Sequence, residues 1–125
     1  MAASRVVVVK AAGAWTPSGA PDATAIARMF ARGLALLTGE PSPAAAAASL
    51  FRPEDRVGIK VNTIGGRALS TRPEVALSLA SWVAGGGLPE KNIIVWDRTT
   101  RELREAGYVP GAGRAGVRIL GTDAD

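Results

Sequence analysis

The sequence predicts an α/β fold with a mainly parallel sheet of about four strands and helices on both faces. Two observations support this prediction. Short apolar runs typical of strands alternate along the chain with segments of helical periodicity. The first of these runs is β-branched and apolar on both sides, as in a strand that is covered on both faces.

The strand expected first is RVVVVK, with its apolar part from Val6 to Val9. A loop rich in glycine and proline follows it. Apolar residues then recur at helical spacing between Ile26 and Leu37, and they predict one face of an amphipathic helix. Asp22 is the expected N-cap of this helix and Gly39 is its expected C-terminal glycine.

The middle of the chain predicts a short helix and a second strand. Ser42 followed by Pro43 is typical of an N-cap and a first helical residue, and the alanine-rich helix that they open is expected to end near Arg52. Between Val57 and Val61 apolar residues alternate with Gly58, Lys60 and Asn62, which is the period of a strand.

The second half continues the alternation. Residues 75–83 predict a helix that ends at three glycines, and Asn92 to Trp96 predicts a third strand. A short helix from Thr100 to Ala106 is expected to begin with a capping box made by Thr99 and Glu102. Residues 117–120 predict a fourth strand.

The composition limits both the organisation and the chemistry. With 125 residues, the chain forms a single α/β domain over 1–125 or the N-terminal portion of a longer domain. It has neither cysteine nor histidine, so no iron–sulfur cluster, thiol nucleophile or imidazole base is available. No metal-binding set is visible, and the sequence indicates no particular cofactor.

The charge and hydropathy patterns limit the classes of partner that the chain is expected to bind. The net charge of +4 comes from scattered arginines and few lysines, whereas nucleic-acid-binding domains gather basic residues on one stripe. Weak nucleic-acid binding is therefore our third choice of function. No segment reaches the length of a membrane span, and the N-terminus lacks the features of a signal peptide. We expect a cytoplasmic location, and an export signal upstream of this sequence stays open.

The candidate site is the edge of the sheet where the strands end. In open α/β sheets, ligands bind beyond the carboxyl ends of the strands, which selects Lys10, residues 60–72 and residues 97–100. We expect a small anionic metabolite or cofactor to bind here, in a domain that could be part of an enzyme. The expected ligand-binding residues are Lys60, Asn62, Gly65, Gly66, Ser70, Thr71, Arg72, Asp97 and Arg98.

The anion-binding interpretation depends on the start of the second long helix. Free backbone N–H groups and the helix dipole favour an anion there, and Arg67 or Arg72 could bind it in a bidentate manner. The alternative is purely structural. In that interpretation Thr71 and Glu74 form a T-x-x-E capping box, Pro73 opens the helix, and the preceding glycines only turn the chain.

Lys60 and Asp97 are the candidate catalytic residues. A buried lysine at a strand end would have a lowered pKa suited to base or Schiff-base chemistry. Such a lysine could equally pair with a carboxylate, and Asp97 is the expected partner. Asp97 itself could also cap the helix that follows it.

The segment GAGRAG, residues 111–116, matches the dinucleotide-binding pattern G-x-G-x-x-G. That mechanism requires the glycines to follow a strand and open a helix. Here they follow a helix and precede a strand, so a turn is expected instead.

Two segments, VGIKVNTIGGRALSTRPE and NIIVWDRTTRELREAGY, resemble a bacterial family known as domain of unknown function 362. The resemblance covers most of the chain and implies an α/β domain longer than this sequence. Many members are fused to ferredoxin-like iron–sulfur modules or carry export signals. Related members often have histidine before the proline of S-T-x-P-E, where this sequence has Arg72.

The T-R-P helix start, with Arg98 at the next strand end, is also similar to the N-terminal domain of nickel-pincer lactate racemases. This similarity implies that Arg72 contacts a small carboxylate or the cofactor. The histidines expected for the nickel chemistry are absent.

A non-catalytic scaffold or interaction module is the alternative function. Its partner would be another chain or a C-terminal part of a longer protein, and an exposed apolar patch along a sheet edge would favour it.

Overall fold

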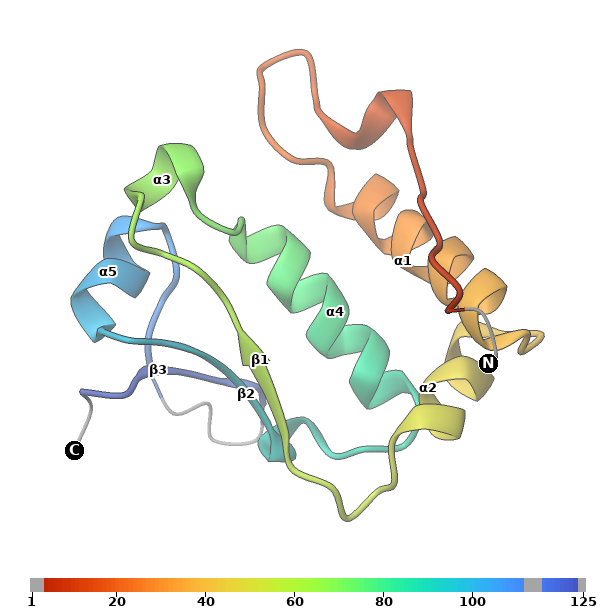
Figure 1. Cartoon of the computed structure of the whole chain (residues 1–125). Helices are drawn as coiled ribbons and strands as arrows, with labels where there is room; N and C mark the ends of the chain where they lie inside the picture. Colours follow the sequence, from red (N-terminus) through yellow and green to blue (C-terminus); the bar gives the residue numbers. More distant parts are fainter. Residues whose placement is uncertain (1–3, 112–115, 124–125) are drawn as a thin grey trace.

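The computed structural model describes residues 4–111 and 116–123, which form an α/β fold around a three-stranded, all-parallel sheet (Figure 1). The strands are β1 (Val57–Lys60), β2 (Ile93–Asp97) and β3 (Arg118–Gly121), in the order β1-β2-β3. The fold class and the parallel pairing predicted from the sequence are therefore confirmed.

Five α-helices and two short 3-10 helices accompany the strands in the described part of the chain. The elements are η1 (Ala12–Ala14), α1 (Ala23–Thr38), α2 (Pro43–Leu50), α3 (Gly66–Leu69), α4 (Pro73–Gly85), η2 (Glu90–Asn92) and α5 (Thr100–Glu105). Within the described residues, none of these helices combines the length and apolar character that crossing a membrane requires.

The predicted helix ends are largely confirmed. The Asp22 carboxylate accepts a hydrogen bond from the backbone of Ala25, and Gly39 ends α1 with a φ of 80°. Ser42 caps α2 through the backbone N–H of Ala45. These caps satisfy N–H groups that have no partner inside a helix, which is why the sequence signals them clearly.

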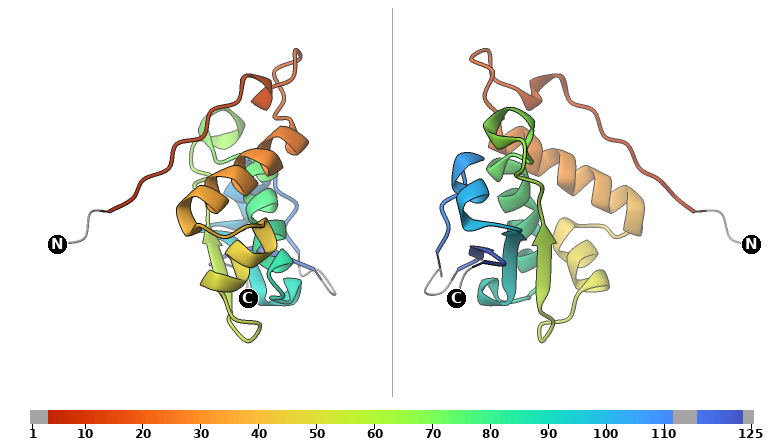
Figure 2. Two further views of the ribbon diagram at one scale, coloured as in Figure 1. Left: turned by 90° about the vertical axis from the view of Figure 1, so that its right-hand side faces the viewer. Right: turned by 60° about the vertical axis from the view of Figure 1, so that its left-hand side comes forward.

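One face of the sheet forms the core. Ile59, Val95 and Ile119 are neighbours across the three strands, and they pack with the buried side chains of α4 and α5. Both connections step in the same direction along the sheet, so right-handed crossovers place both helices on this one face. Figure 2 shows β1 and β2 in front of α4 in its right-hand view.

No described helix packs on the opposite face, although we expected helices on both. This face carries Gly58, Lys60, Ile94 and Trp96, which are all partly or fully exposed. The Trp96 indole nitrogen lies 3.1 Å from the position that a Cβ on Gly58 would take. Gly58 therefore leaves room for the Trp96 side chain. This side chain covers part of the face that no described helix covers.

The first predicted strand is not part of the sheet. Residues 6–9 are extended but pair with none of the three strands, so the sheet has three strands where about four were expected. Val7 and Val9 lie against α1, while Val6 and Val8 are 83% and 73% exposed. The apolar pattern of residues 6–9 is suited to the interior of a sheet. In the structure, half of these valine side chains are covered, and a helix covers them instead of a sheet.

Candidate functional site

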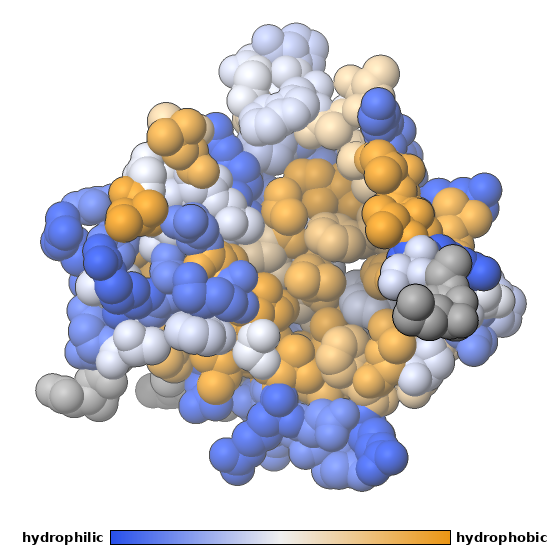
Figure 3. Space-filling model, viewed as in Figure 1, coloured by the Kyte–Doolittle hydropathy of each residue, from blue (hydrophilic) through white to orange (hydrophobic). Residues whose placement is uncertain are grey.

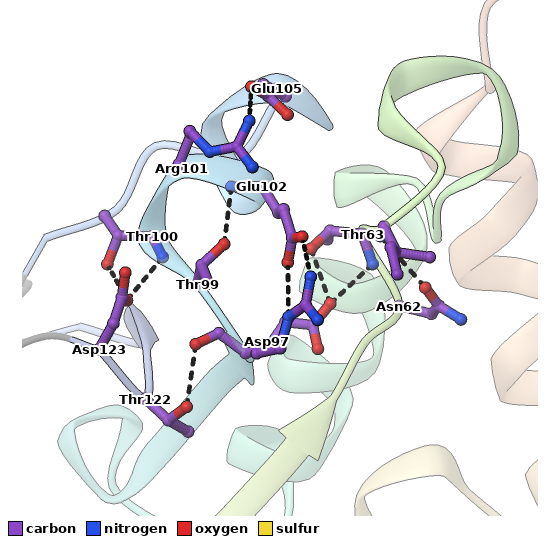
Figure 4. A network of polar contacts seen from close by, with 12 residues as sticks. Asn62, Thr63, Asp97, Thr99, Thr100, Arg101, Glu102, Glu105, Thr122 and Asp123 are labelled. Atoms are coloured by element: carbon purple, nitrogen blue, oxygen red, sulfur yellow. Dashed lines mark hydrogen bonds and ion pairs between the residues drawn. The ribbon is translucent and has the colours of Figure 1, made fainter.

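Asp97, at the end of β2, is the centre of a polar network that joins two strand ends (Figure 4). One carboxylate oxygen lies 2.5 Å from the Lys60 ammonium, and the other accepts hydrogen bonds of 2.7 Å from both the backbone N–H and the hydroxyl of Thr63. Thr63 is fully buried and Asp97 is nearly so. The carboxylate is thus held by three atoms of the chain, which leave little of it for a ligand.

This environment keeps Asp97 ionised. Burial alone would raise the pKa of Asp97, but the hydrogen bonds from Lys60, Thr63 and the backbone of Arg98 outweigh it. Together they hold the pKa of this carboxyl well below its usual range. A carboxylate of this kind is a poor general base near neutral pH, because it binds a proton too weakly.

Lys60 pairs with Asp97, as the structural interpretation expected. Its side chain is 51% exposed, lies over the Trp96 ring at 5.5 Å, and also donates to the backbone oxygen of Val61. The buried lysine that the catalytic interpretation requires is therefore not found at this position.

Asn62 and Thr71 connect the end of β1 to the start of α4. The Asn62 backbone oxygen accepts from Thr71, and the Thr71 hydroxyl accepts from the Asn62 backbone at 3.3 Å. Between them the chain makes the short helix α3, which begins after Gly65. Gly66 has a φ of 57°, a value that glycine adopts without strain. Both glycines shape this loop.

Arg98 and Glu102 form an ion pair just beyond β2 (Figure 4). The Glu102 carboxylate is buried, and its hydrogen bond from Arg98 lowers the pKa of Glu102. Thr99 caps α5 through the backbone of Glu102, which confirms half of the predicted capping box. The other half is wrong, because the Glu102 carboxylate bonds to Arg98 rather than to the backbone.

The start of α4 differs from the capping box predicted for Thr71 and Glu74. The N-cap is Arg72, and no side chain of the described residues accepts a hydrogen bond from the first turn. Pro73 occupies the first helical position and so places the cap one residue after Thr71. One Glu74 carboxylate oxygen and the Ser70 hydroxyl are buried without a hydrogen-bond partner among the described residues.

A polar cleft of about 300 Å³ opens at this uncapped helix start. Arg67, Arg72 and Glu74 supply its charges, and Ser18 closes one side. The cleft is completed by Gly19, Ala20, Pro21, Pro73, Ala106 and Gly107. It therefore joins the loop before α1, the start of α4 and the end of α5, three segments that are distant in the sequence.

The two arginines of the cleft are held by contacts that leave their charges unneutralised. The Arg67 guanidinium nitrogens lie 3.1–3.2 Å from the position of a Cβ on Gly107, so this glycine makes room for the side chain. The Arg72 guanidinium lies over the Trp15 ring at 5.7 Å. Neither arginine forms an ion pair with a carboxylate in the part of the chain that the structure describes.

The structure separates the predicted site residues into two groups. Lys60, Asp97 and Arg98 are engaged in ion pairs, and Asn62 is engaged in the loop. Of the nine predicted residues, Arg72 alone lines the polar cleft. Lys10 is exposed and does not line the cleft. Most of the GAGRAG segment, residues 112–115, lies outside the described residues.

Sequence reasoning missed Thr63 and the position of Ser18. Thr63 lies three residues after the end of β1, and only its hydrogen bonds to the buried Asp97 carboxylate show why a threonine is needed there. Ser18 lies in a loop that folds back through hydrogen bonds between Thr16 and Ala20. No local pattern connects that loop to α4, so its contribution depends on tertiary structure alone.

Comparisons with known proteins return no match: no family model, curated protein or solved structure resembles this chain significantly. The resemblances drawn from the sequence motifs stay hypotheses. Among the described residues, no group of three or more acidic side chains is placed to hold a metal ion. The absence of cysteine excludes an iron–sulfur cluster bound through thiolates of this chain.

Proposed function

We propose that this domain binds a small organic anion in the polar cleft at the start of α4, with Arg67 and Arg72 as the main contacts. The observation that carries the proposal is the pair of guanidinium groups at a helix start that has no side-chain cap. Neither guanidinium is neutralised by a carboxylate among the described residues. Such a cluster is completed by an anion from outside.

The α4 N-terminus strengthens the preference for negative charge. Its thirteen residues are long enough for a full helix dipole, and the first backbone N–H groups, that of Glu74 among them, have no partner inside the helix. A carboxylate or phosphate could accept from this N–H and from the two arginines at once. Each charge-assisted hydrogen bond of this kind contributes roughly 1.5–3 kcal/mol.

Glu74 narrows the chemistry of the ligand. Its carboxylate lines the same cleft, and one of the two carboxylate oxygens is buried without a hydrogen-bond partner in the described part of the chain. A ligand that carried only negative charge would repel this oxygen. A ligand that also carries a hydroxyl or ammonium group could donate to it. We therefore propose a small hydroxy or amino carboxylate rather than a bare inorganic anion.

Binding of glycolate and acetate by isothermal titration calorimetry tests this proposal. These two carboxylates differ by one hydroxyl group, so we expect glycolate to bind several-fold more tightly. Arg67→Met should weaken glycolate at least tenfold, since it removes the charge and keeps the aliphatic stem. Arg28→Met is the matched control, because Arg28 lies exposed on α1 and lines neither cavity.

Glu74→Gln distinguishes the two parts of the proposal. It should strengthen the binding of acetate, because it removes the repulsion by the Glu74 charge, and so reduce the preference for glycolate over acetate. Equal affinity of the wild-type protein for both ligands would contradict the role of Glu74. Glycolate binding that survives Arg67→Met unchanged would contradict the anion site itself.

We propose interaction with a partner chain as a second function, in place of the general scaffold alternative. An apolar groove beside α1 and the unpaired edge of β1 favour it.

A further inference from the structure

A large apolar groove runs beside α1, separate from the polar cleft except where Pro21 and Arg72 line both. Its volume is about 640 Å³. Its apolar walls come from the extended segment of residues 5–9, from η1 and Trp15, from α1, and from Val75 of α4. Figure 3 shows this apolar surface in the hollow centre of the molecule, over α1 and α4.

An unpaired strand edge lies on the other side of α4 from this segment. Among the described residues, β1 is an edge strand that pairs only with β2. The backbone N–H of Val61 donates to Trp96 of β2. Backbone groups alternate in direction along a strand, so those of Gly58 and Lys60 point away from β2. The free edge of β1 thus presents hydrogen-bonding groups toward the space beside it.

The helix layer is wider than the sheet that it covers. α4 lies over the sheet, whereas α1 packs against α4, and its buried residues Ala25 and Ile26 stay outside the core cluster that covers the sheet. Packed helix axes lie roughly 8–10 Å apart and paired strands roughly 4.8 Å apart. One helix spacing therefore corresponds to about two strand spacings.

The segment of residues 5–9 already lies where an outer strand would be. It is extended, packs on α1 through Val7 and Val9, and rises in the same general direction as β1 in all the views of Figures 1 and 2. Its backbone makes no hydrogen bond to other backbone groups among the described residues. Two extended segments with unpaired backbones therefore flank one unfilled strand position.

We propose that this position accepts one extended strand from a partner polypeptide, which pairs with the free edge of β1 and covers the groove. The completed sheet would read residues 5–9, partner strand, β1, β2, β3. Pairing of a peptide with a sheet edge draws affinity from main-chain hydrogen bonds and specificity from alternate side chains.

The groove also defines the side chains of the partner strand. Residues on the face toward α1 and α4 must be apolar, because Met29, Phe30, Leu34 and Leu37 of α1 line the groove. The two charged residues of the lining, Arg5 and Arg72, are both cations. An acidic residue at either end of the partner strand complements them.

The charge pattern disfavours a second copy of this chain as the source of the strand. The one unpaired apolar strand-like segment of the described chain is that of residues 6–9, and it is bounded by Arg5 and Lys10. Inserted into a neighbouring molecule, it would bring cations next to cations. A strand with acidic ends has no such conflict.

An acetylated heptapeptide with valine and isoleucine alternating with threonine, between two terminal glutamates, is the probe. Amide hydrogen exchange measured by NMR should slow at least tenfold at Gly58 and Lys60 when the peptide saturates the protein. The same peptide with lysine at both ends should bind at least tenfold more weakly. A peptide with proline at its centre should give no protection, because proline cannot continue the ladder.

Val7→Asp and Val8→Asp form a matched pair of variants. Val7 lines the groove, whereas its neighbour Val8 is 73% exposed and lines no part of it. Val7→Asp should weaken the acidic peptide at least tenfold, and Val8→Asp should change its affinity less than threefold. Circular dichroism and the exchange rates of Ile93 and Val95 in the core show whether both variants remain folded.

Three results would overturn the proposal. The first is unchanged exchange at Gly58 and Lys60 at saturating peptide. The second is equal binding of the acidic and basic peptides. The third is a concentration-dependent dimer of the protein that protects the same two amides without any peptide, which would make a second copy the occupant.

Discussion

The Lys60 ammonium and the Asp97 carboxylate lie 2.5 Å apart and tie the ends of β1 and β2 together. In the register of the sheet Lys60 is opposite Trp96, so the lysine crosses the indole ring to reach the next residue of β2. The same carboxylate holds both polar groups of Thr63. One aspartate therefore fixes the loop that leads to α3 and α4 and so positions Arg67 and Arg72.

Asp97→Asn should destabilise the domain by about 2 kcal/mol, since a buried amide nitrogen would face the donors of Lys60 or Thr63. Urea unfolding measures this loss. Glu105→Gln is the control, because Glu105 forms an exposed pair with Arg101 on α5, and its removal should change stability by less than about 0.5 kcal/mol. Equal losses of stability in the two variants would show that the Asp97 network stabilises the fold no more than an exposed ion pair does.

Stability should fall in acid, and Asp97 should account for part of the fall. The pKa of Asp97 lies well below its ordinary value in the folded protein, so the unfolded chain binds a proton first as the pH drops. The contribution is complete above the unfolded pKa of 3.8 and is lost as the pH falls below it. Glu102 and Asp123, whose pKa values are also lowered, add to the same trend.

Urea midpoints measured from neutral pH down to about pH 2.5 test this prediction. The Asp97→Asn variant should lose less stability than the wild-type protein over the acidic part of that range. Identical acid dependence of the two proteins would contradict the assignment.

Tyr108, the only tyrosine of the chain, should titrate late. Burial raises the pKa of Tyr108 to about 12, helped by the charges of Glu74 and Asp97. Its hydroxyl donates to the Thr71 backbone oxygen at 2.9 Å. The folded protein thus holds the phenol proton longer than the unfolded chain, so stability should fall as pH rises from about 10 toward 12. Absorbance near 295 nm follows the single phenolate, and a midpoint near 10 in the folded protein would contradict this environment.

Gly121→Ala should be strongly destabilising, by about 2 kcal/mol or more. A Cβ at this position would lie 2.3 Å from the Thr100 nitrogen and 2.6 Å from the Thr99 carbonyl carbon, so β3 and the start of α5 could not keep their contact. Gly13→Ala is the matched control, because no atom lies within 4 Å of its Cβ position. Thermal unfolding of both variants should separate them clearly, and equal melting temperatures would contradict the close packing at Gly121.

Much of the fold could be predicted from the sequence, because many of its elements are specified by interactions between residues that are close together in the sequence. The caps at Asp22, Ser42 and Thr99 satisfy helix N–H groups within three residues, and the structure has all three. The strands at β1, β2 and β3 also match their apolar patterns. The strand predicted at Val6 to Val9 is not part of the sheet, because a strand needs a neighbouring strand to pair with. No local sequence pattern shows whether such a neighbour is present.

The candidate site was harder to predict, because it depends on contacts between distant segments. T-x-x-E at Thr71 and Glu74 looked like a cap, yet Pro73 shifted the helix start and left the Glu74 carboxylate for the cleft. The pairing of Lys60 with Asp97 was one of two open interpretations, and only the strand register decided it. Gly107, which makes room for Arg67, is 40 residues away from it in the sequence.

The most direct test of the proposed function follows the arginine side chains themselves during a glycolate titration by NMR. We predict that the Nε–Hε signals of Arg67 and Arg72 shift saturably with one common dissociation constant, while those of Arg28 and Arg32 on α1 stay in place. Unmoved Arg67 and Arg72 signals, or shifts of the same size at all arginines, would contradict an anion site at the start of α4.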